Sequence, residues 1–132
     1  MATKTTENEV KAEKILSQES RSKVPFSVVE AYKNLRIHLV SLLEKNNSKV
    51  VAISSANASE GKSTTSINLA VTLSQLNKKV IVVDADSRRA TIHQKLKIEN
   101  EKGCLDVING GSELKDVIKQ YNPYLDVITA GS

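Results

Sequence analysis

The chain has 132 residues and a formal net charge of +4, with 39% hydrophobic, 26% charged and 3% aromatic residues. This length suffices for at most one domain, and no apolar run approaches the roughly 20 residues of a membrane-spanning helix. The polar N-terminus argues against a secretion signal. A single cysteine, Cys104, excludes an intrachain disulfide and fits a reducing cytosol. His38 and His93 have no cysteine or histidine at metal-ligand spacing, so we expect no zinc site.

The basic pI of about 9.2 raises the question of an anionic partner such as nucleic acid or a membrane surface. Acidic and basic residues are interleaved along most of the chain, and nothing resembles an aromatic–arginine stacking surface. The pattern therefore indicates a solvated surface, and we expect no nucleic-acid partner.

The N-terminal third predicts a polar arm followed by one amphipathic helix. Residues 1–24 show no sustained apolar period. After Pro25, "SVVE" at 27–30 has the capping-box pattern, with serine at the cap and glutamate three residues later. The helix is expected to end near Lys45, and its apolar face to contain Val28, Tyr32, Leu35, Leu39 and Leu42.

The remaining elements alternate between strand and helix patterns. Strands are predicted at 50–54, 79–86 and 124–132, since these runs are short, β-branched and unalternating, as in buried parallel strands. A helix is predicted at 62–76, and short helices near 90–96, 104–109 and 112–119. This order predicts an α/β fold with a parallel sheet and right-handed crossovers. With about three strands the sheet is incomplete, so we expect the chain to be the N-terminal part of a longer protein.

The stretch "ANASEGKSTT" at 56–65 predicts a phosphate-binding loop between a strand and a helix. In such a loop, backbone N–H groups and the positive end of the helix surround the phosphates. Lys62 would reach the β- and γ-phosphates, and the Ser63 hydroxyl would bind Mg²⁺. A non-glycine residue at Ser59 is strained if the loop needs positive φ there. The alternative is an ordinary helix start. The predicted nucleotide-binding residues are Ala58, Ser59, Glu60, Gly61, Lys62, Ser63 and Thr64.

The stretch "VIVVDADSRRA" places two carboxylates, Asp84 and Asp86, at the end of a predicted buried strand. Open parallel sheets bind their ligands at the carboxyl ends of the strands. One carboxylate could join the Mg²⁺ shell and the other could accept a proton from an attacking hydroxyl. The alternative is a solvated turn, because aspartate and serine favour turns. We expect this strand to lie beside the loop-bearing strand, so that residues 25–132 form the N-terminal part of a P-loop nucleotide-binding domain.

From about residue 26 onward the chain resembles the bacterial tyrosine kinases of capsule and exopolysaccharide synthesis, of the CapB/CpsD type. The resemblance rests on five stretches: "EAYKNLR" at 30–36, "ANASEGKSTT" at 56–65, "VIVVDADSRR" at 80–89, "GCLDVING" at 103–110 and "LDVITAG" at 125–131. Many members of that family also begin the loop with alanine, as at Ala56. The acidic motif of the family, Asp-x-Asp-x-Arg, is matched by Asp84, Asp86 and Arg88.

This resemblance implies autophosphorylation on tyrosine with ATP and Mg²⁺ as cofactors. It implies catalytic roles for Lys62, Asp84 and Asp86, with Ser63 and the two aspartates at the metal. It also implies a cytoplasmic protein at the inner face of the plasma membrane, docked to a membrane adaptor that controls polysaccharide chain length. Ring assembly would use the first helix, through Glu30, Lys33 and Arg36.

The chain departs from the family pattern at several places. Ala58-Ser59 replaces the usual Pro-Gly, which predicts weaker ATP binding. Lys33 replaces an arginine and loses its bidentate fork, which predicts weaker assembly. Glu30 and Lys33 equally fit a surface i,i+3 pair. The family's later Mg²⁺-binding Asp motif and tyrosine cluster are not found in residues 1–132, so we expect this chain alone to show no appreciable autophosphorylation.

Two other functions stay open at this point. The first is a partitioning or positioning ATPase of the ParA/MinD kind, although such proteins carry a signature lysine where this chain has Asn57. The second is a non-catalytic module that binds a partner through the helix at 27–45.

Overall fold

The computed structural model describes residues 26–54 and 61–132, so the polar arm predicted at 1–24 lies outside the described residues. The chain divides into two compact units, residues 1–76 and 77–132, and each is described by itself. Among the described residues, no helix is both long and apolar enough to cross a membrane.

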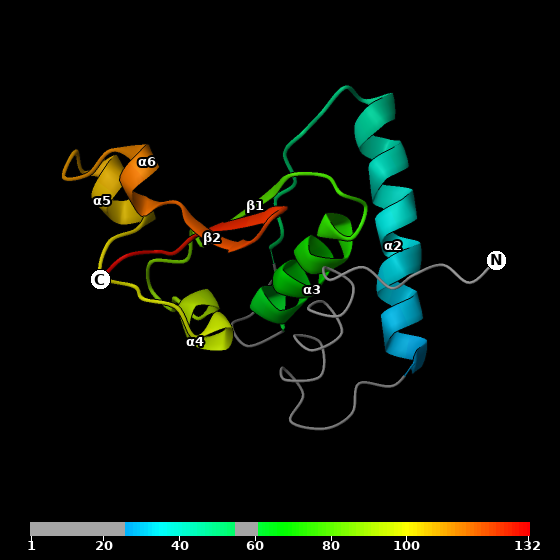
Figure 1. The fold of residues 1–132 in the computed structure, drawn as a ribbon, viewed down its shortest axis with the longest axis horizontal. Helices are drawn as coiled ribbons and strands as arrows, with labels where there is room; N and C mark the ends of the chain where they lie inside the picture. The colour runs from blue at the N-terminus through cyan, green and yellow to red at the C-terminus, as the bar shows by residue number, and fades with distance from the viewer. Residues whose placement is uncertain (1–25, 55–60) are drawn as a thin grey trace. The chain divides into compact units, whose positions relative to one another are not determined.

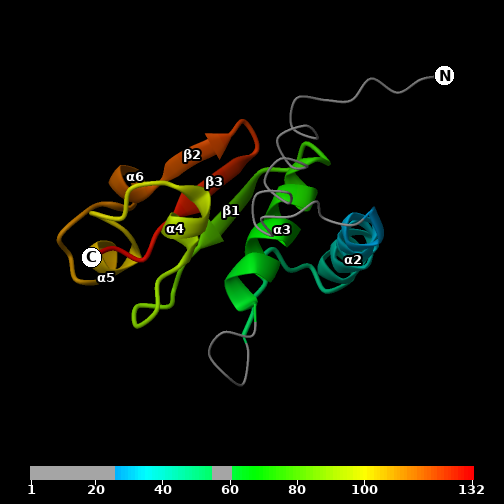
Figure 2. The same ribbon diagram turned by 90° about the horizontal axis from the view of Figure 1, so that it is seen from below.

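The first unit contains two helices that lie side by side, α2 (Phe26–Lys45) and α3 (Lys62–Ser74) (Figures 1 and 2). Both helices were predicted, and α2 begins one residue before the expected cap, Ser27. From Ile67 to Thr72 every residue of α3 is buried, which is typical of a helix that is covered on all sides. Two of its hydroxyl groups satisfy themselves within the helix, since Thr72 donates to the Leu69 carbonyl and Ser74 to the Val71 carbonyl.

The apolar face expected on α2 is only partly correct. Tyr32 and Leu39 are half-buried, but Val28, Leu35 and Leu42 are 38%, 44% and 56% exposed. Arg36 lies on the covered side, where its guanidinium donates hydrogen bonds to α3. The covered face of α2 includes the polar contact of Arg36, which a pattern of apolar residues does not reveal. The sequence analysis therefore predicted a different face of the helix as buried.

The strand predicted at 50–54 does not form. Residues 48–54 have no regular structure, and Val50 and Val51 are 83% and 43% exposed. A β-branched run becomes a strand only where a neighbouring strand supplies its hydrogen-bond partners. None of the strands among the described residues pairs with this segment.

The second unit is a three-stranded sheet of order β1-β3-β2 with three short helices, shown in Figure 2. Strand β1 (Val80–Val83) runs parallel to β3 (Leu125–Ile128), with Val80 opposite Leu125. Between these strands lie α4 (Ile92–Leu96), α5 (Cys104–Ile108), α6 (Leu114–Val117) and β2 (Lys119–Asn122). The two strands predicted in this unit are therefore confirmed, although both are shorter than the predicted runs.

Strand β2 was missed by the sequence analysis, and it makes the sheet mixed rather than purely parallel. It runs antiparallel to β3, with Lys119 opposite Val127 and a register shift between Gln120 and Asn122. Its sequence, "KQYN", has no β-branched residue and only Tyr121 favours a strand, so its strand signal is weak. The signal that could have found it is the turn at Asn122-Pro123, where the Tyr124 N–H donates to Asn122 Oδ1 over 2.9 Å.

Two stretches quoted above without a local role, 103–110 and 125–131, lie against each other in this unit. The backbone N–H groups of Cys104 and Leu105 donate to the carbonyls of Thr129 and Ala130 over 2.7 and 2.9 Å. Asn100 closes the same junction, because its side-chain amide exchanges two hydrogen bonds with the backbone of Gly131. A Cβ atom at Gly103 would overlap the Thr129 carbonyl oxygen, so the close approach of the two segments requires glycine there.

We expect Gly103→Ala to destabilise the protein by about 1–3 kcal/mol, because the added methyl group forces two backbone segments apart. The measurement is urea unfolding of the 132-residue chain. Gly111→Ala is the matched control, since its Cβ would meet only the Asp106 carbonyl oxygen at an ordinary 3.6 Å. Equal midpoints for the two variants would contradict the packing described here.

Candidate nucleotide-binding site

Helix α3 begins with a backbone conformation that requires glycine. Gly61 is the residue before the helix and has φ 79° and ψ 18°, in the left-handed region. Its position leaves open space for a Cβ, so the requirement is conformational rather than steric. The Gly61 carbonyl accepts the Thr65 N–H over 2.8 Å, which starts the helical ladder directly after this turn. The turn at Gly61 puts the N–H groups of Lys62, Ser63 and Thr64 at the start of α3, which is the kind of position where helices bind anions.

Three of the predicted nucleotide-binding residues, Ala58, Ser59 and Glu60, lie outside the described residues. The effect of replacing the usual Pro-Gly by Ala58-Ser59 therefore stays a prediction. Lys62, Ser63 and Thr64 are half-buried in the first turn of α3. Of the predicted loop, the structure thus describes the glycine turn and the helix start.

The two aspartates lie at the carboxyl end of β1, as predicted. Asp84 is 4% exposed, and its two carboxylate oxygens accept the backbone N–H groups of Asp86 (3.1 Å) and Ile92 (3.3 Å). Asp86 is half-buried, and its Oδ1 accepts the Arg89 N–H over 3.0 Å. Both carboxylates therefore brace the segment between β1 and α4. The bond from Ile92 is a contact that sequence reasoning did not foresee.

The backbone hydrogen bonds of Asp84 and Asp86 are compatible with metal binding. A carboxylate oxygen has two lone pairs, and one N–H bond uses only one of them. No group of three or more Asp, Glu, His or Cys side chains that could hold a metal occurs among residues 26–54 and 61–132. A Mg²⁺ ion bound with a nucleotide does not need such a group, because it uses one or two carboxylates, phosphate oxygens and water. The residues present are therefore compatible with Mg²⁺ that arrives with a nucleotide.

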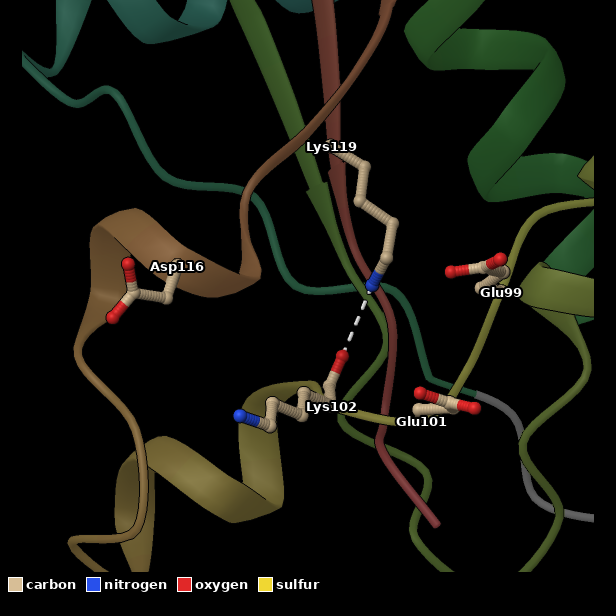
Figure 3. A pocket seen from close by; sticks show the side chains of 5 residues that line it. All are labelled: Glu99, Glu101, Lys102, Asp116 and Lys119. Atoms are coloured by element: carbon tan, nitrogen blue, oxygen red, sulfur yellow. Dashed lines mark hydrogen bonds between the residues drawn. The ribbon is translucent and has the colours of Figure 1, made fainter.

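The second unit also has an open pocket of about 170 Å³ that is too small for a nucleotide, since small-molecule sites usually enclose 300–1,000 Å³. Figure 3 shows Lys119 reaching toward the Lys102 carbonyl, with Glu99 and Glu101 to one side and Asp116 to the other. The Lys119 ammonium donates to that carbonyl over 3.0 Å and to Thr129 Oγ1 over 3.1 Å. The pocket is lined by three acidic residues and two lysines, one of which is already hydrogen-bonded, and its small volume alone rules it out as a nucleotide site.

The three residues expected to serve ring assembly differ in their surroundings. Glu30 and Lys33 form an i,i+3 ion pair at 3.9 Å on an exposed part of α2, as the alternative interpretation described. Arg36 instead points to α3 and donates from Nη1 to the Thr72 carbonyl and to Gln75 Oε1. The structure thus places Arg36 in a contact within one chain, which the motif alone did not indicate.

Comparisons with known proteins decide the family. A model of the AAA domain matches residues 48–132, more than half of the chain. The chain belongs to the AAA-domain family. This match covers the glycine turn at Gly61, helix α3, and Asp84 and Asp86.

Bacterial tyrosine kinases are among the proteins similar to this chain. The tyrosine-protein kinase YwqD of Bacillus subtilis is 38% identical over 103 residues, which are 77% of this chain and 44% of that protein. The tyrosine-protein kinase etk of Escherichia coli is 34% identical over 106 residues, or 80% of this chain and 15% of that protein. The chain therefore spans less than half the length of either relative.

The solved kinase domain of Escherichia coli tyrosine kinase ETK has the same fold. It matches 89% of this chain and 46% of its own length, with a TM-score of 0.79 and 31% identity. The α/β fold with a small sheet and flanking helices is confirmed, and so is the resemblance to bacterial tyrosine kinases drawn from the sequence motifs.

Proposed function

We propose that the protein is an ATP-dependent protein-tyrosine kinase whose nucleotide binds at the start of helix α3. The observation that carries this proposal is the left-handed Gly61 directly before Lys62-Ser63-Thr64, in an AAA-domain chain similar to tyrosine-protein kinases. The amides of the first helical turn and the Lys62 ammonium would bind phosphate oxygens. Ala58, Ser59 and Glu60 would complete the loop, and the Ser63 hydroxyl would face the metal.

In the proposed reaction a tyrosine hydroxyl attacks the γ-phosphorus, the bond from that phosphorus to the bridging oxygen breaks, and ADP leaves. The tyrosine proton passes to a carboxylate, for which Asp86 is the better candidate because it is less buried than Asp84. Asp84 and Ser63 would hold Mg²⁺, which neutralises charge on the β- and γ-phosphates when bound. Lys62 would contribute a further positive charge.

The wider role proposed is in capsule or exopolysaccharide synthesis, with a membrane adaptor as partner, at the inner face of the plasma membrane. This part of the proposal is supported by relatives such as the putative tyrosine-protein kinase in the cps region of Klebsiella pneumoniae, 36% identical over 107 residues. Self-association through the first helix belongs to the same proposal. Glu30 and Lys33 stay candidates for it, because both side chains are partly exposed on α2.

We expect autophosphorylation to need more than the described units. The 132-residue chain with ATP and Mg²⁺ should give no appreciable phosphotyrosine. A form extended by roughly 100 residues should give a strong signal, since the match covers only 46% of the solved ETK kinase domain. The measurement is a phosphotyrosine blot, with the extended Lys62→Met form as the blank. Strong phosphorylation of the 132-residue chain would show that the catalytic centre or its acceptor has been misplaced. No phosphorylation of the extended form in any condition would argue instead for a non-catalytic module or an ATPase.

A further inference from the structure

Arg36 joins helix α2 to the last turn of helix α3. Its Nη1 donates to the Thr72 carbonyl over 2.8 Å and to the side-chain oxygen of Gln75 over 3.0 Å. Its Nε is buried and has no hydrogen-bond partner in the part of the chain that the structure describes. The guanidinium is therefore held against α3 within one chain.

The position of this contact matters because the last carbonyls of a helix lack partners within it. In α3 the Val71 and Leu73 carbonyls accept the N–H groups of Gln75 and Leu76, while the Thr72 carbonyl accepts Arg36. A cation at this end also opposes the negative end of the helix dipole. Arg36 thus supplies a donor to one of the last carbonyls of α3, at the helix end farthest from Gly61.

Helix α3 depends on such contacts, because an isolated helix of its 13 residues is marginally stable in water. A nucleotide at its first turn and Arg36 at its last turn would both favour the same formed helix. Two groups that favour one state of an element are coupled in free energy, and the coupling is reciprocal.

We propose that Arg36 is a positioning residue for the nucleotide, acting through helix α3 rather than by touching the ligand. This inference rests on the nucleotide site proposed above. It assigns to Arg36 a task inside one chain, distinct from the assembly role that the motif at 30–36 implies.

The first test is amide hydrogen exchange of the 132-residue chain without nucleotide. Arg36→Met keeps much of the side-chain stem and removes the donors, so protection at the C-terminal turn of α3 should fall about tenfold. Arg36→Lys keeps a charge and one donor group and should restore part of that protection. Lys45→Met is the matched control, since Lys45 is an exposed lysine at the C-terminal end of α2 with no proposed role in assembly. Unchanged protection in Arg36→Met would overturn the proposal.

The second test is the affinity for Mg²⁺·ADP, measured by calorimetry on the same variants. Arg36→Met should bind about threefold to tenfold more weakly, Arg36→Lys should recover part of the affinity, and Lys45→Met should match the wild type. If the wild type binds ADP and Arg36→Met binds equally well, or differs only in oligomeric state, the positioning role is wrong. If the wild type binds no ADP, both the proposed nucleotide site and the positioning role of Arg36 are wrong. The hydrogen-exchange difference would then show only that Arg36 stabilises the end of α3.

Discussion

Replacing Lys62 by methionine is expected to weaken Mg²⁺·ATP or Mg²⁺·ADP binding by about 1.5–3 kcal/mol, because it removes a charge-assisted hydrogen bond to phosphate. Methionine keeps the length and the helix propensity of the side chain, so α3 should form as before. The measurement is calorimetric titration of the 132-residue chain at fixed salt.

Lys49→Met is the control for the change in net charge, because Lys49 is exposed and lies in a segment without regular structure. Its nucleotide affinity should equal that of the wild type. The assignment of the site to the start of α3 would not survive equal affinities for wild type and Lys62→Met.

The second large effect is expected at the carboxyl end of β1, where Asp86→Asn should reduce phosphotransfer by at least about a hundredfold through loss of a proton acceptor. An asparagine oxygen can still accept the Arg89 N–H, so we expect this variant to lose much more phosphotransfer activity than folding stability. Rates are measured on an extended, phosphorylating form of the protein, and stability by urea unfolding.

Asp84→Asn should differ from Asp86→Asn in stability. Both oxygens of Asp84 accept backbone N–H groups in a buried place, and an asparagine would turn its NH₂ group toward one of them. An unsatisfied buried donor costs about 1–3 kcal/mol, so this variant should lose stability as well as activity. If both variants phosphorylate normally, the two aspartates only brace the turn and the catalytic assignment is wrong.

The local elements of this protein were largely determined by its sequence. Spacing of apolar residues predicted α2 and α3, and β-branched runs predicted β1 and β3. The motif around Gly61 was also readable, because a glycine before a helix-opening Lys-Ser marks a turn that other residues adopt at a cost. Such signals depend on the intrinsic preferences of a few neighbouring residues, so they need no knowledge of the rest of the chain.

Only the tertiary structure decided the features that depend on partners distant in sequence. The run at 50–54 has the composition of a strand but no ladder partner among the described strands, while the unpromising "KQYN" becomes β2 because a short turn brings it to β3. Arg36 was assigned to assembly from its motif, yet it binds Thr72, which lies 36 residues away. Hydrogen bonds between distant segments leave no periodic trace in a sequence, because either partner is compatible with many surroundings until the fold brings them together.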